Sequence, residues 1–357
     1  MMDVVIIGAG LSGLTAAAVL RAAGASVRIL EADAQIGGRI RPLRDPASNL
    51  AIADLGPTWV WPRHQPVVTR WLEDLGAATF EQFNEGNAVI VGYGPAPLRQ
   101  PLPGQNGMVR IAGGLTTLVG TLANRVGHDN IRRSAQVTEV SEHGPDHIAV
   151  HLSSSEIITA QKVIISVPLR ITATTIRLPW ASSALIDDMR RMPTWMSTHA
   201  KAVAIYEKPF WRDDGLSGRV VSRIGPLAEV HDHTGVDHTP AALFGFVNWP
   251  PEQRRANPER LRRAILDQLS DCFGDAAAHP LELAIQDWAM NHWIVSALDT
   301  SQQATHPDIG PASLRQPHLE GRVRFAVSEA SKLSPGLIEG ALAIGERAAL
   351  ELLEANL

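Results

Sequence analysis

The first 39 residues constrain the fold more than any other stretch of the chain. Val4 to Ile7 is a continuous apolar run, which is typical of a buried parallel strand. A turn with the spacing G-x-G-x-x-G follows at once over 8–13, and the Ala- and Leu-rich segment 14–23 then predicts a helix. Residues 26–30 predict a second strand that ends at Glu31. This order of elements is that of a βαβ unit.

The three glycines of the turn have separate steric roles. Gly8 permits the tight turn, Gly10 lets the backbone approach a pyrophosphate, and Gly13 lets helix and strand pack closely. The pyrophosphate would lie on unpaired N–H groups at the start of the helix. Glu31, 18 residues after Gly13, can accept hydrogen bonds from ribose hydroxyls. The sequence therefore predicts a dinucleotide site; the alternative is a glycine-rich turn in an ordinary βαβ unit.

Two further motifs indicate which dinucleotide is bound. Gly-Gly-Arg at 37–39 suits a second approach of backbone to the cofactor, with Arg39 as a fixed cation for the phosphates. Asp-Leu-Gly-Pro-Thr-Trp follows at 54–59. Together these stretches resemble the flavin-containing amine oxidases of the monoamine oxidase type. The resemblance implies FAD, with nicotinamide cofactors as the alternative, and Glu31 would repel the 2′-phosphate of NADP.

Later segments resemble the same family in the same order. Residues 131–167 resemble the segment that returns to the FAD domain, where backbone at Val137 meets the adenine. Residues 327–341 resemble the C-terminal flavin motif, with an acid at Glu329 for the pyrophosphate and ribitol; the alternative is a capped amphipathic helix. The FAD contacts implied by the resemblance are Gly8, Gly10, Leu11, Ser12, Gly13, Glu31, Ala32, Gly37, Gly38, Arg39, Leu55, Gly56, Pro57, Thr58, Trp59, Val137, Glu329, Gly336, Leu337 and Ile338.

Lys201 is the expected catalytic residue. It stands in the apolar run 200–206, eight residues before Pro-Phe-Trp at 209–211. The segment resembles the one whose lysine reaches the flavin N5 through a water and assists reoxidation. Burial would lower the pKa of Lys201. The alternative is a lysine at a strand edge that faces solvent.

The substrate side departs from the family pattern. Members often flank the substrate amine with two aromatic residues, and the matching positions here are Leu337 and Leu298. Trp293 lies close enough to Leu298 to substitute for it, and Trp61 either lines the substrate pocket or packs in the core. In some members a cysteine beside the second aromatic bonds the flavin. Ala297 stands at that place, so we expect non-covalent FAD.

The composition argues against several other classes. A formal charge of −5 leaves no basic footprint for nucleic acid. The single cysteine, Cys272, excludes an internal disulfide framework and fits a reducing compartment. No signal peptide and no apolar run of about 18 residues is apparent, so we expect a soluble, cytoplasmic protein without a membrane partner.

Two other chemistries are disfavoured. The histidines of His231-Asp232-His233, with His238 nearby, resemble a metal set, but their strand-to-turn setting favours a solvated loop, and we expect no metal. The chain shows no G-x-S-x-G elbow and no Cys–His pair near a motif, which argues against a hydrolase.

The resemblance covers nearly the whole chain and implies an α/β fold. We expect a Rossmann-like FAD-binding domain of the GR2 type (1–81, 112–190 and 298–357), interleaved with a smaller α+β substrate domain (82–111 and 191–297). In full-length members a long helical excursion fills the interval that here runs only from Ala77 to Ala112. We therefore expect a short member with a reduced substrate domain. Either a homodimer partner covers the flavin or the site is open to bulky substrates.

Three functions remain open. The first is an FAD-dependent oxidase that moves a hydride from the C–N bond of an amine to the flavin, with O₂ as acceptor. Lys201 favours this function. The second is a flavin desaturase or dehydrogenase that acts on a C–C bond, which the missing aromatic pair favours. The third is a flavin-binding protein without catalytic activity.

Overall fold

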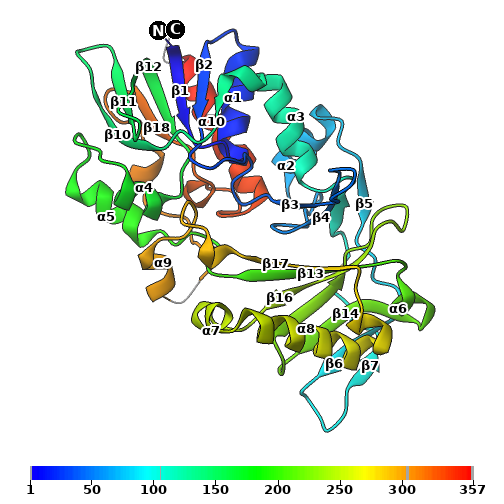
Figure 1. Ribbon diagram of the computed structural model, residues 1–357. Helices are drawn as coiled ribbons and strands as arrows, with labels where there is room; N and C mark the ends of the chain where they lie inside the picture. The colour runs from blue at the N-terminus through cyan, green and yellow to red at the C-terminus, as the bar shows by residue number, and fades with distance from the viewer. Residues whose placement is uncertain (1, 105, 303–304, 355–357) are drawn as a thin grey trace.

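Two seven-stranded sheets, one above the other in Figure 1, form the two halves of the molecule. The computed structural model describes residues 2–104, 106–302 and 305–354. The start of β1 and the end of α10 both lie at the outer end of the first sheet (Figure 1). No described helix is long and apolar enough to cross a lipid bilayer.

The first sheet collects strands from the beginning, the middle and the end of the chain. Its order is β10-β11-β12-β1-β2-β9, and β18 also pairs with β12. The strands are β1 (Met2–Ile7), β2 (Val27–Leu30), β9 (Ile131–Arg132), β10 (Val137–Glu142), β11 (Ile148–Leu152), β12 (Ile157–Ile165) and β18 (Val323–Phe325). β1 pairs in parallel with β2 and β12, as predicted from its continuous apolar run, Val4 to Ile7.

The second sheet has the order β17-β13-β16-β15-β14-β6-β7. Its strands are β6 (Asn87–Val91), β7 (Leu98–Gln100), β13 (Ala200–Tyr206), β14 (Leu216–Ser222), β15 (Leu227–Asp232), β16 (Ala241–Val247) and β17 (Glu282–Asp287). Two small two-stranded sheets complete the strands: β3 (Pro42–Arg44) with β4 (Ala51–Asp54), and β5 (Thr79–Glu81) with β8 (Val109–Ile111).

The helices cover both sheets. They are α1 (Leu11–Ala22), α2 (Pro66–Asp74), α3 (Thr116–Val126), α4 (Leu169–Thr175), α5 (Ser183–Arg191), α6 (Phe210–Asp213), α7 (Pro251–Ala256), α8 (Pro258–Phe273), α9 (Ala297–Ser301) and α10 (Ile338–Glu354). One apolar cluster joins alternate residues of β1 to α1, α3 and α10, and a second joins the other face of β1 to α4 and α5. The parallel strands are therefore buried on both faces, and their carboxyl ends remain available for a ligand.

Helices α1 and α10 pack with their backbones very close together. A Cβ atom on Gly345 would lie 2.3 Å from the Ser12 carbonyl oxygen, so no larger residue fits at this position. This contact brings the start of the C-terminal helix next to the glycine-rich turn, although the two segments are more than 300 residues apart in sequence.

All seven residues of β13 are buried. One face of the second sheet packs on α8, and the other face packs on residues of the β3–β4 hairpin and on Leu55 and Trp59. The second sheet therefore closes over the segment that carries the Asp-Leu-Gly motif, and it presents β13 to the first half of the molecule.

Three stretches of the chain are interrupted in the structure. Residues 131–142 form β9 and β10, which are separated at Ser134, whose φ is 52°. Residues 216–232 form the β14–β15 hairpin, which turns at Gly225 with φ +82°. Residues 251–273 form α7 and α8, which are divided at Pro258, because proline has no N–H to continue the first helix.

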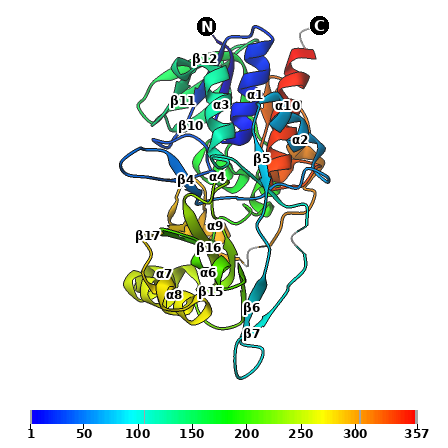
Figure 2. The same ribbon diagram turned by 90° about the vertical axis from the view of Figure 1, so that its right-hand side faces the viewer.

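The interval from Ala77 to Ala112 holds four short strands, and its described residues form no helix. β5 and β8 stay beside the first half of the molecule, whereas β6 and β7 leave it and extend the second sheet. Figure 2 shows the β6–β7 hairpin as a projection at the far end of that sheet. The described part of the interval is therefore built of short strands and their connections.

Candidate active site

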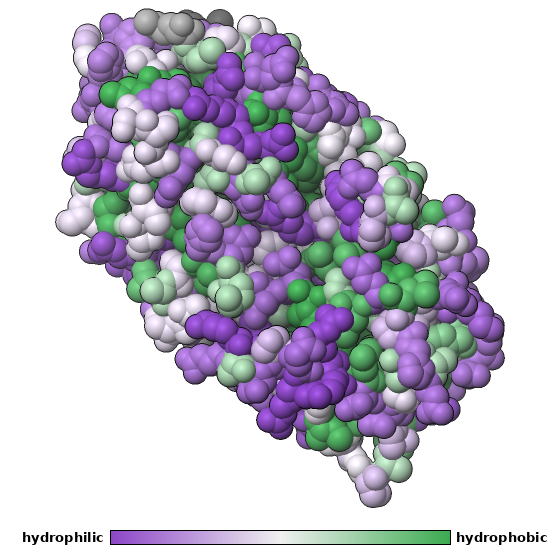
Figure 3. Space-filling model, viewed as in Figure 1, coloured by the Kyte–Doolittle hydropathy of each residue, from purple (hydrophilic) through white to green (hydrophobic). Residues whose placement is uncertain are grey.

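A cavity of about 410 Å³ lies where the two halves meet. Its walls come from the carboxyl ends of β1, β2, β12 and β18, from the loop 54–61, from the start of β13 and from the start of α10. In Figure 3, hydrophobic side chains gather on the surface along this same junction. The volume lies within the range of about 300–1,000 Å³ that is typical of small-molecule sites.

The glycine-rich turn leaves room for an anionic group at one end of the cavity. A Cβ atom on Gly10 would meet no protein atom within 4 Å, whereas one on Gly13 would lie 2.1 Å from the Gly8 carbonyl oxygen. No side chain caps α1, so its first N–H groups remain available. Open space, free donors and the helix dipole together suit a pyrophosphate.

Glu31 follows β2 and faces the same end of the cavity. Its Oε2 accepts the Ala9 N–H at 2.7 Å, and its Oε1 accepts the Asp33 N–H at 2.8 Å. Burial raises the pKa of this carboxyl above its usual value. Each oxygen keeps a further lone pair, so the side chain can still accept hydrogen bonds from ribose hydroxyls.

Arg39 and Glu329 join segments 290 residues apart. Arg39 donates to both carboxylate oxygens, at 2.6 and 3.1 Å, and to Ser328 Oγ at 2.8 Å. The guanidinium also reaches the Trp195 carbonyl, and the Trp195 N–H donates to Glu329. Burial alone would raise the pKa of Glu329, but Arg39 lowers it below its usual value. Arg39 is therefore held in place by Glu329 while it lines the cavity, and its role as a fixed cation for the phosphates stays a prediction.

Lys201 is 3% exposed, which rules out a solvent-facing strand edge. Its Nζ donates to the Gly56 carbonyl at 3.0 Å and to Thr58 Oγ1 at 2.5 Å, and it lies 4.0 Å from the centre of the Phe244 ring. Burial lowers the pKa of Lys201 to about 7, although nearby Asp54 opposes the shift. The motif loop and β13 thus place a titratable amine in the cavity wall.

Family comparison decides the class of the site. The model of the family described as "Flavin containing amine oxidoreductase" matches residues 94–353, and that of an NAD(P)-binding Rossmann-like domain matches residues 6–75. The chain belongs to the flavin-containing amine oxidoreductase family. Its cofactor is FAD, and its fold is the Rossmann-like α/β architecture expected from the sequence.

Individual relatives agree with the family. Putrescine oxidase from Kocuria rosea is 23% identical over 99% of this chain and 95% of its own length, and amine oxidase B from Mus musculus is 24% identical over 99% and 86%. The alignment with the first spans 479 positions, so more than a hundred of them face gaps in this 357-residue chain.

Solved structures of family members have the same fold. Putrescine oxidase with putrescine bound superposes with a TM-score of 0.82 at 22% identity, and cyclohexylamine oxidase from Brevibacterium oxydans IH-35A with 0.83 at 20%. Both comparisons cover 99% of each chain.

The residues of this amine oxidoreductase cavity fit FAD. The uncapped helix start and Gly10 suit the pyrophosphate, Glu31 suits a ribose, and Lys201 lies on the wall at the far end. Most of the sequence-predicted FAD contacts line the cavity. They are Gly8, Gly10, Leu11, Ser12, Glu31, Ala32, Gly37, Gly38, Arg39, Leu55, Gly56, Pro57, Thr58, Trp59, Val137, Gly336, Leu337 and Ile338.

Two predicted contacts lie behind the wall. Gly13 sits beneath the turn, where its missing side chain permits the close packing described above. Glu329 lies behind Arg39 and fixes the guanidinium. Gly13 therefore acts on the cofactor site through its contact with Gly8, and Glu329 acts through its pair with Arg39.

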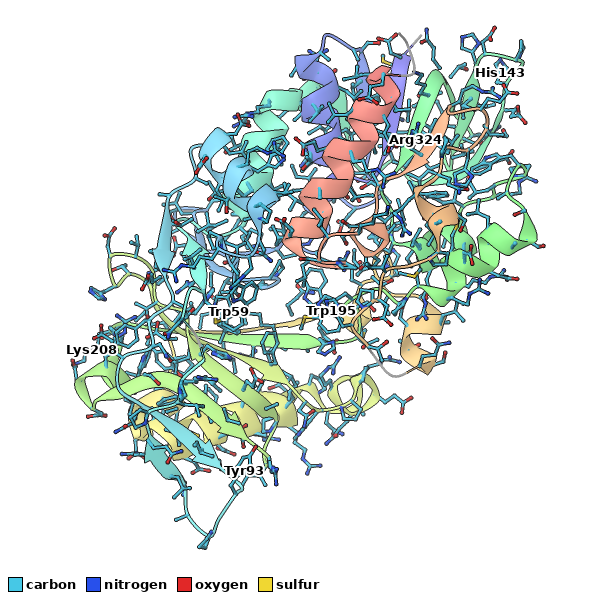
Figure 4. All side chains as sticks on the ribbon, turned by 180° about the vertical axis from the view of Figure 1, so that it is seen from behind. Trp59, Tyr93, His143, Trp195, Lys208 and Arg324 are labelled. Atoms are coloured by element: carbon cyan, nitrogen blue, oxygen red, sulfur yellow. The ribbon has the colours of Figure 1, made fainter. Side chains whose placement is uncertain are left out.

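Aromatic side chains line the cavity about Lys201, and we call this part its aromatic end. Phe246 is the cross-strand neighbour of Lys201, and His199 stands two residues before it. Five tryptophans also line the cavity. Figure 4 shows Trp59 and Trp195 at the level where the two halves meet. Trp59 is held by a hydrogen bond of 2.7 Å to Gln82. The five tryptophans are Trp59, Trp61, Trp195, Trp288 and Trp293.

Sequence reasoning missed Trp195, His199 and Phe246. A signal was present for two of them: His199 stands two positions before Lys201, so that both side chains leave the chain on one face, and Phe246 pairs with Lys201 across the sheet. No motif marked Trp195, which lies in the connection between α5 and β13.

The expected substrate residue Leu298 is not among the residues that line the cavity, and neither is Ala297. Ser296 caps α9 through a capping box with Asp299, and this turn leaves Ala297 exposed to solvent. Trp293 and Ile294 reach the cavity from this part of the chain instead.

The expectation of a solvated His231–His233 loop is wrong. These residues lie on β15 or directly after it, and all three are at most 4% exposed. β15 is an inner strand between β14 and β16, so its polar side chains are covered on both sides. His233 Nε2 accepts the Asp54 N–H at 2.9 Å. Among the described residues, no group of His, Cys, Asp and Glu is arranged to hold a metal.

Proposed function

We propose that this chain oxidises the C–N bond of a small-molecule amine, with O₂ as the electron acceptor. The observation that carries the proposal is Lys201, a buried amine in the cavity wall between Gly56 and Thr58. The named activities of its relatives, putrescine oxidase and cyclohexylamine oxidase, support an amine substrate. FAD, when bound, accepts the electron pair from the substrate and passes it to O₂.

The chain's own residues have three tasks in this reaction. The aromatic walls exclude water and orient the substrate. Lys201, with a pKa of about 7, can hold or release a proton in the physiological range. Its positive form also places a charge beside the reacting centre, where the low dielectric strengthens electrostatic effects.

A desaturase or dehydrogenase acting on a C–C bond is the second candidate, because Leu337 stands where many members have an aromatic residue. The two functions are separated by mixing purified holoenzyme with a panel of amines, first without oxygen and then with it. Amine oxidation predicts bleaching of the flavin followed by hydrogen peroxide in equal amount to the imine. If a substrate with a saturated C–C bond bleaches the flavin and no amine does, the second candidate is established instead.

We expect the FAD to be bound without a covalent link. The single cysteine, Cys272, is buried in α8 and packs against the second sheet, away from the cavity lining. Acid precipitation of the holoenzyme should leave all the yellow colour in the supernatant. Flavin that stays in the pellet after washing would contradict this expectation.

We also infer a homodimer, a cytoplasmic location and the domain division given above, with FAD-binding segments 1–81, 112–190 and 298–357. The short interval between β5 and β8 supports the dimer, because a cavity without its helical cover gains from a second chain. Light scattering at micromolar concentration should give twice the chain mass; a monomer would contradict the dimer.

The single cysteine supports the cytoplasmic location, because it fits a reducing compartment.

A further inference from the structure

Charge is distributed unequally along the cavity. Among the described residues that line it, the carboxylates are Glu31 and Asp33, and both lie at the end of β2 beside the glycine-rich turn. The aromatic end, about Lys201, has no carboxylate in its described lining. A cationic group of a substrate would therefore find no negative partner in that part of the wall.

Two acids lie behind the aromatic end, and neither lines the cavity. Asp54 is buried near Lys201, and its Oδ1 accepts the Leu115 N–H at 3.0 Å. Asp287 is the last residue of β17, and Arg254 donates to both of its oxygens at 2.7 and 2.8 Å. Arg254 also donates to the Thr198 carbonyl at 2.8 Å. The pair is buried under the segment that leads into β13, and its charges cancel.

His199 is the polar group that this segment directs to the aromatic end. Its side chain lines the cavity next to Trp195, with 6.1 Å between the ring centres. Its Nδ1 is buried and has no hydrogen-bond partner. Burial, assisted by Arg254, lowers the pKa of His199, so the ring is neutral at pH 7. A neutral imidazole can donate or accept a hydrogen bond but cannot neutralise an ammonium.

We propose that the aromatic end selects monoamines with an uncharged body, that His199 determines this specificity, and that diamines are excluded. The inference rests on the proposed amine oxidation and names the class of its substrate. A monoamine directs its one amine toward the reacting centre and packs its apolar body on the tryptophans. A diamine must in addition bury a second ammonium without a partner, which is strongly unfavourable. This chain would then differ from its relative putrescine oxidase, since putrescine is a diamine.

The test compares amines of equal length on the holoenzyme. Butylamine is paired with 1,4-diaminobutane, and hexylamine with 1,6-diaminohexane. Stopped-flow reduction of the flavin without oxygen gives the second-order rate constant for each amine. Calorimetry with dithionite-reduced holoenzyme, which cannot turn over, gives the dissociation constants. We expect each monoamine to exceed its diamine by roughly 100-fold or more in both measurements.

A substitution at His199 tests the location of the effect. His199→Glu supplies the missing carboxylate, so the preference for the monoamine should fall at least about tenfold in the ratio of the two rate constants. His199→Gln is the matched control, because it keeps a neutral hydrogen-bonding group and should leave that ratio unchanged. The ratio within one variant is insensitive to a general loss of activity.

The possible results separate the amine preference, the role of His199 and the proposed function. Diamines that react as fast as monoamines in the wild type would overturn the inference and leave amine oxidation standing. An unchanged ratio in His199→Glu would overturn the assignment to His199. If neither class of amine reduces the flavin, while another donor does, the proposed function fails and this inference fails with it.

Discussion

Lys201→Met is expected to slow reoxidation of the reduced flavin by O₂ roughly 10²- to 10⁴-fold, while FAD binding changes little. The lysine is buried in the cavity wall, and its partners are Gly56 and Thr58 rather than a carboxylate. Methionine fills a similar volume but can neither transfer a proton nor carry a charge. Stopped-flow mixing of reduced enzyme with oxygenated buffer measures the rate.

The pH dependence of that rate gives a second readout. With a pKa of about 7, Lys201 is mostly protonated below neutral pH. If the protonated form assists the reaction, the wild-type rate falls as the pH rises through about 7, and the variant shows no such step. Lys208→Met is the matched control, since that side chain is 73% exposed and lies far from the cavity (Figure 4). A wild-type rate in Lys201→Met would reduce Lys201 to a structural role.

The same lowered pKa predicts a trend in the stability of the apoprotein. Lys201 titrates near 10.5 in the unfolded chain and near 7 in the folded one. Between these values the unfolded state binds more protons, so the free energy of unfolding rises with pH across this window. Lys201→Met removes this contribution. The difference in urea midpoint between wild type and variant should therefore shift in favour of the wild type as the pH increases from 7 to 10.

Arg39→Leu is expected to lower the free energy of unfolding by about 3 kcal/mol and to weaken FAD binding at least about tenfold. The substitution leaves Glu329, which is 2% exposed, without its countercharge. We take the lower end of the range for a broken buried pair because the Arg39 side chain is 24% exposed. Urea unfolding of the apoprotein and titration with FAD measure the two effects.

Two controls separate the effects of charge and of shape. Arg39→Leu combined with Glu329→Leu removes both charges and should recover most of the stability but not the FAD affinity. Arg70→Leu breaks a partly exposed pair with Glu346 and should cost less than about 1 kcal/mol. An Arg39→Leu protein as stable as wild type would show that the pair contributes little to folding.

Local steric rules made the N-terminal unit predictable. The glycines at 8, 10 and 13 each have a role that depends on neighbouring backbone, and the structure places a close contact or an open space where each rule requires it. The place of Lys201 in the cavity wall was predictable because its apolar strand and the Pro-Phe-Trp segment resemble one family motif. Its burial then followed from the position of β13 inside a covered sheet.

The remaining features depend on tertiary contacts that no local pattern encodes. The pair between Arg39 and Glu329 joins segments 290 residues apart. Leu298 was expected at the cavity but does not line it, because the sequence 289–318 has no periodicity that would fix its alignment. His233 was assigned to a solvated loop because a run of polar residues in the sequence is typical of a turn. Its buried partner, the Asp54 N–H, becomes known only from the structure.

The discontinuous first sheet links cofactor capture to the last stage of folding. β18 pairs with β12 across about 160 residues, and α10 packs on α1 across more than 300. Contacts of such long sequence separation form slowly, and the second half can collapse on its own segments meanwhile. During synthesis on the ribosome, the glycine-rich turn therefore remains without the packing of α10 until that helix has been made. We expect nascent chains that lack α10 to be unable to retain FAD.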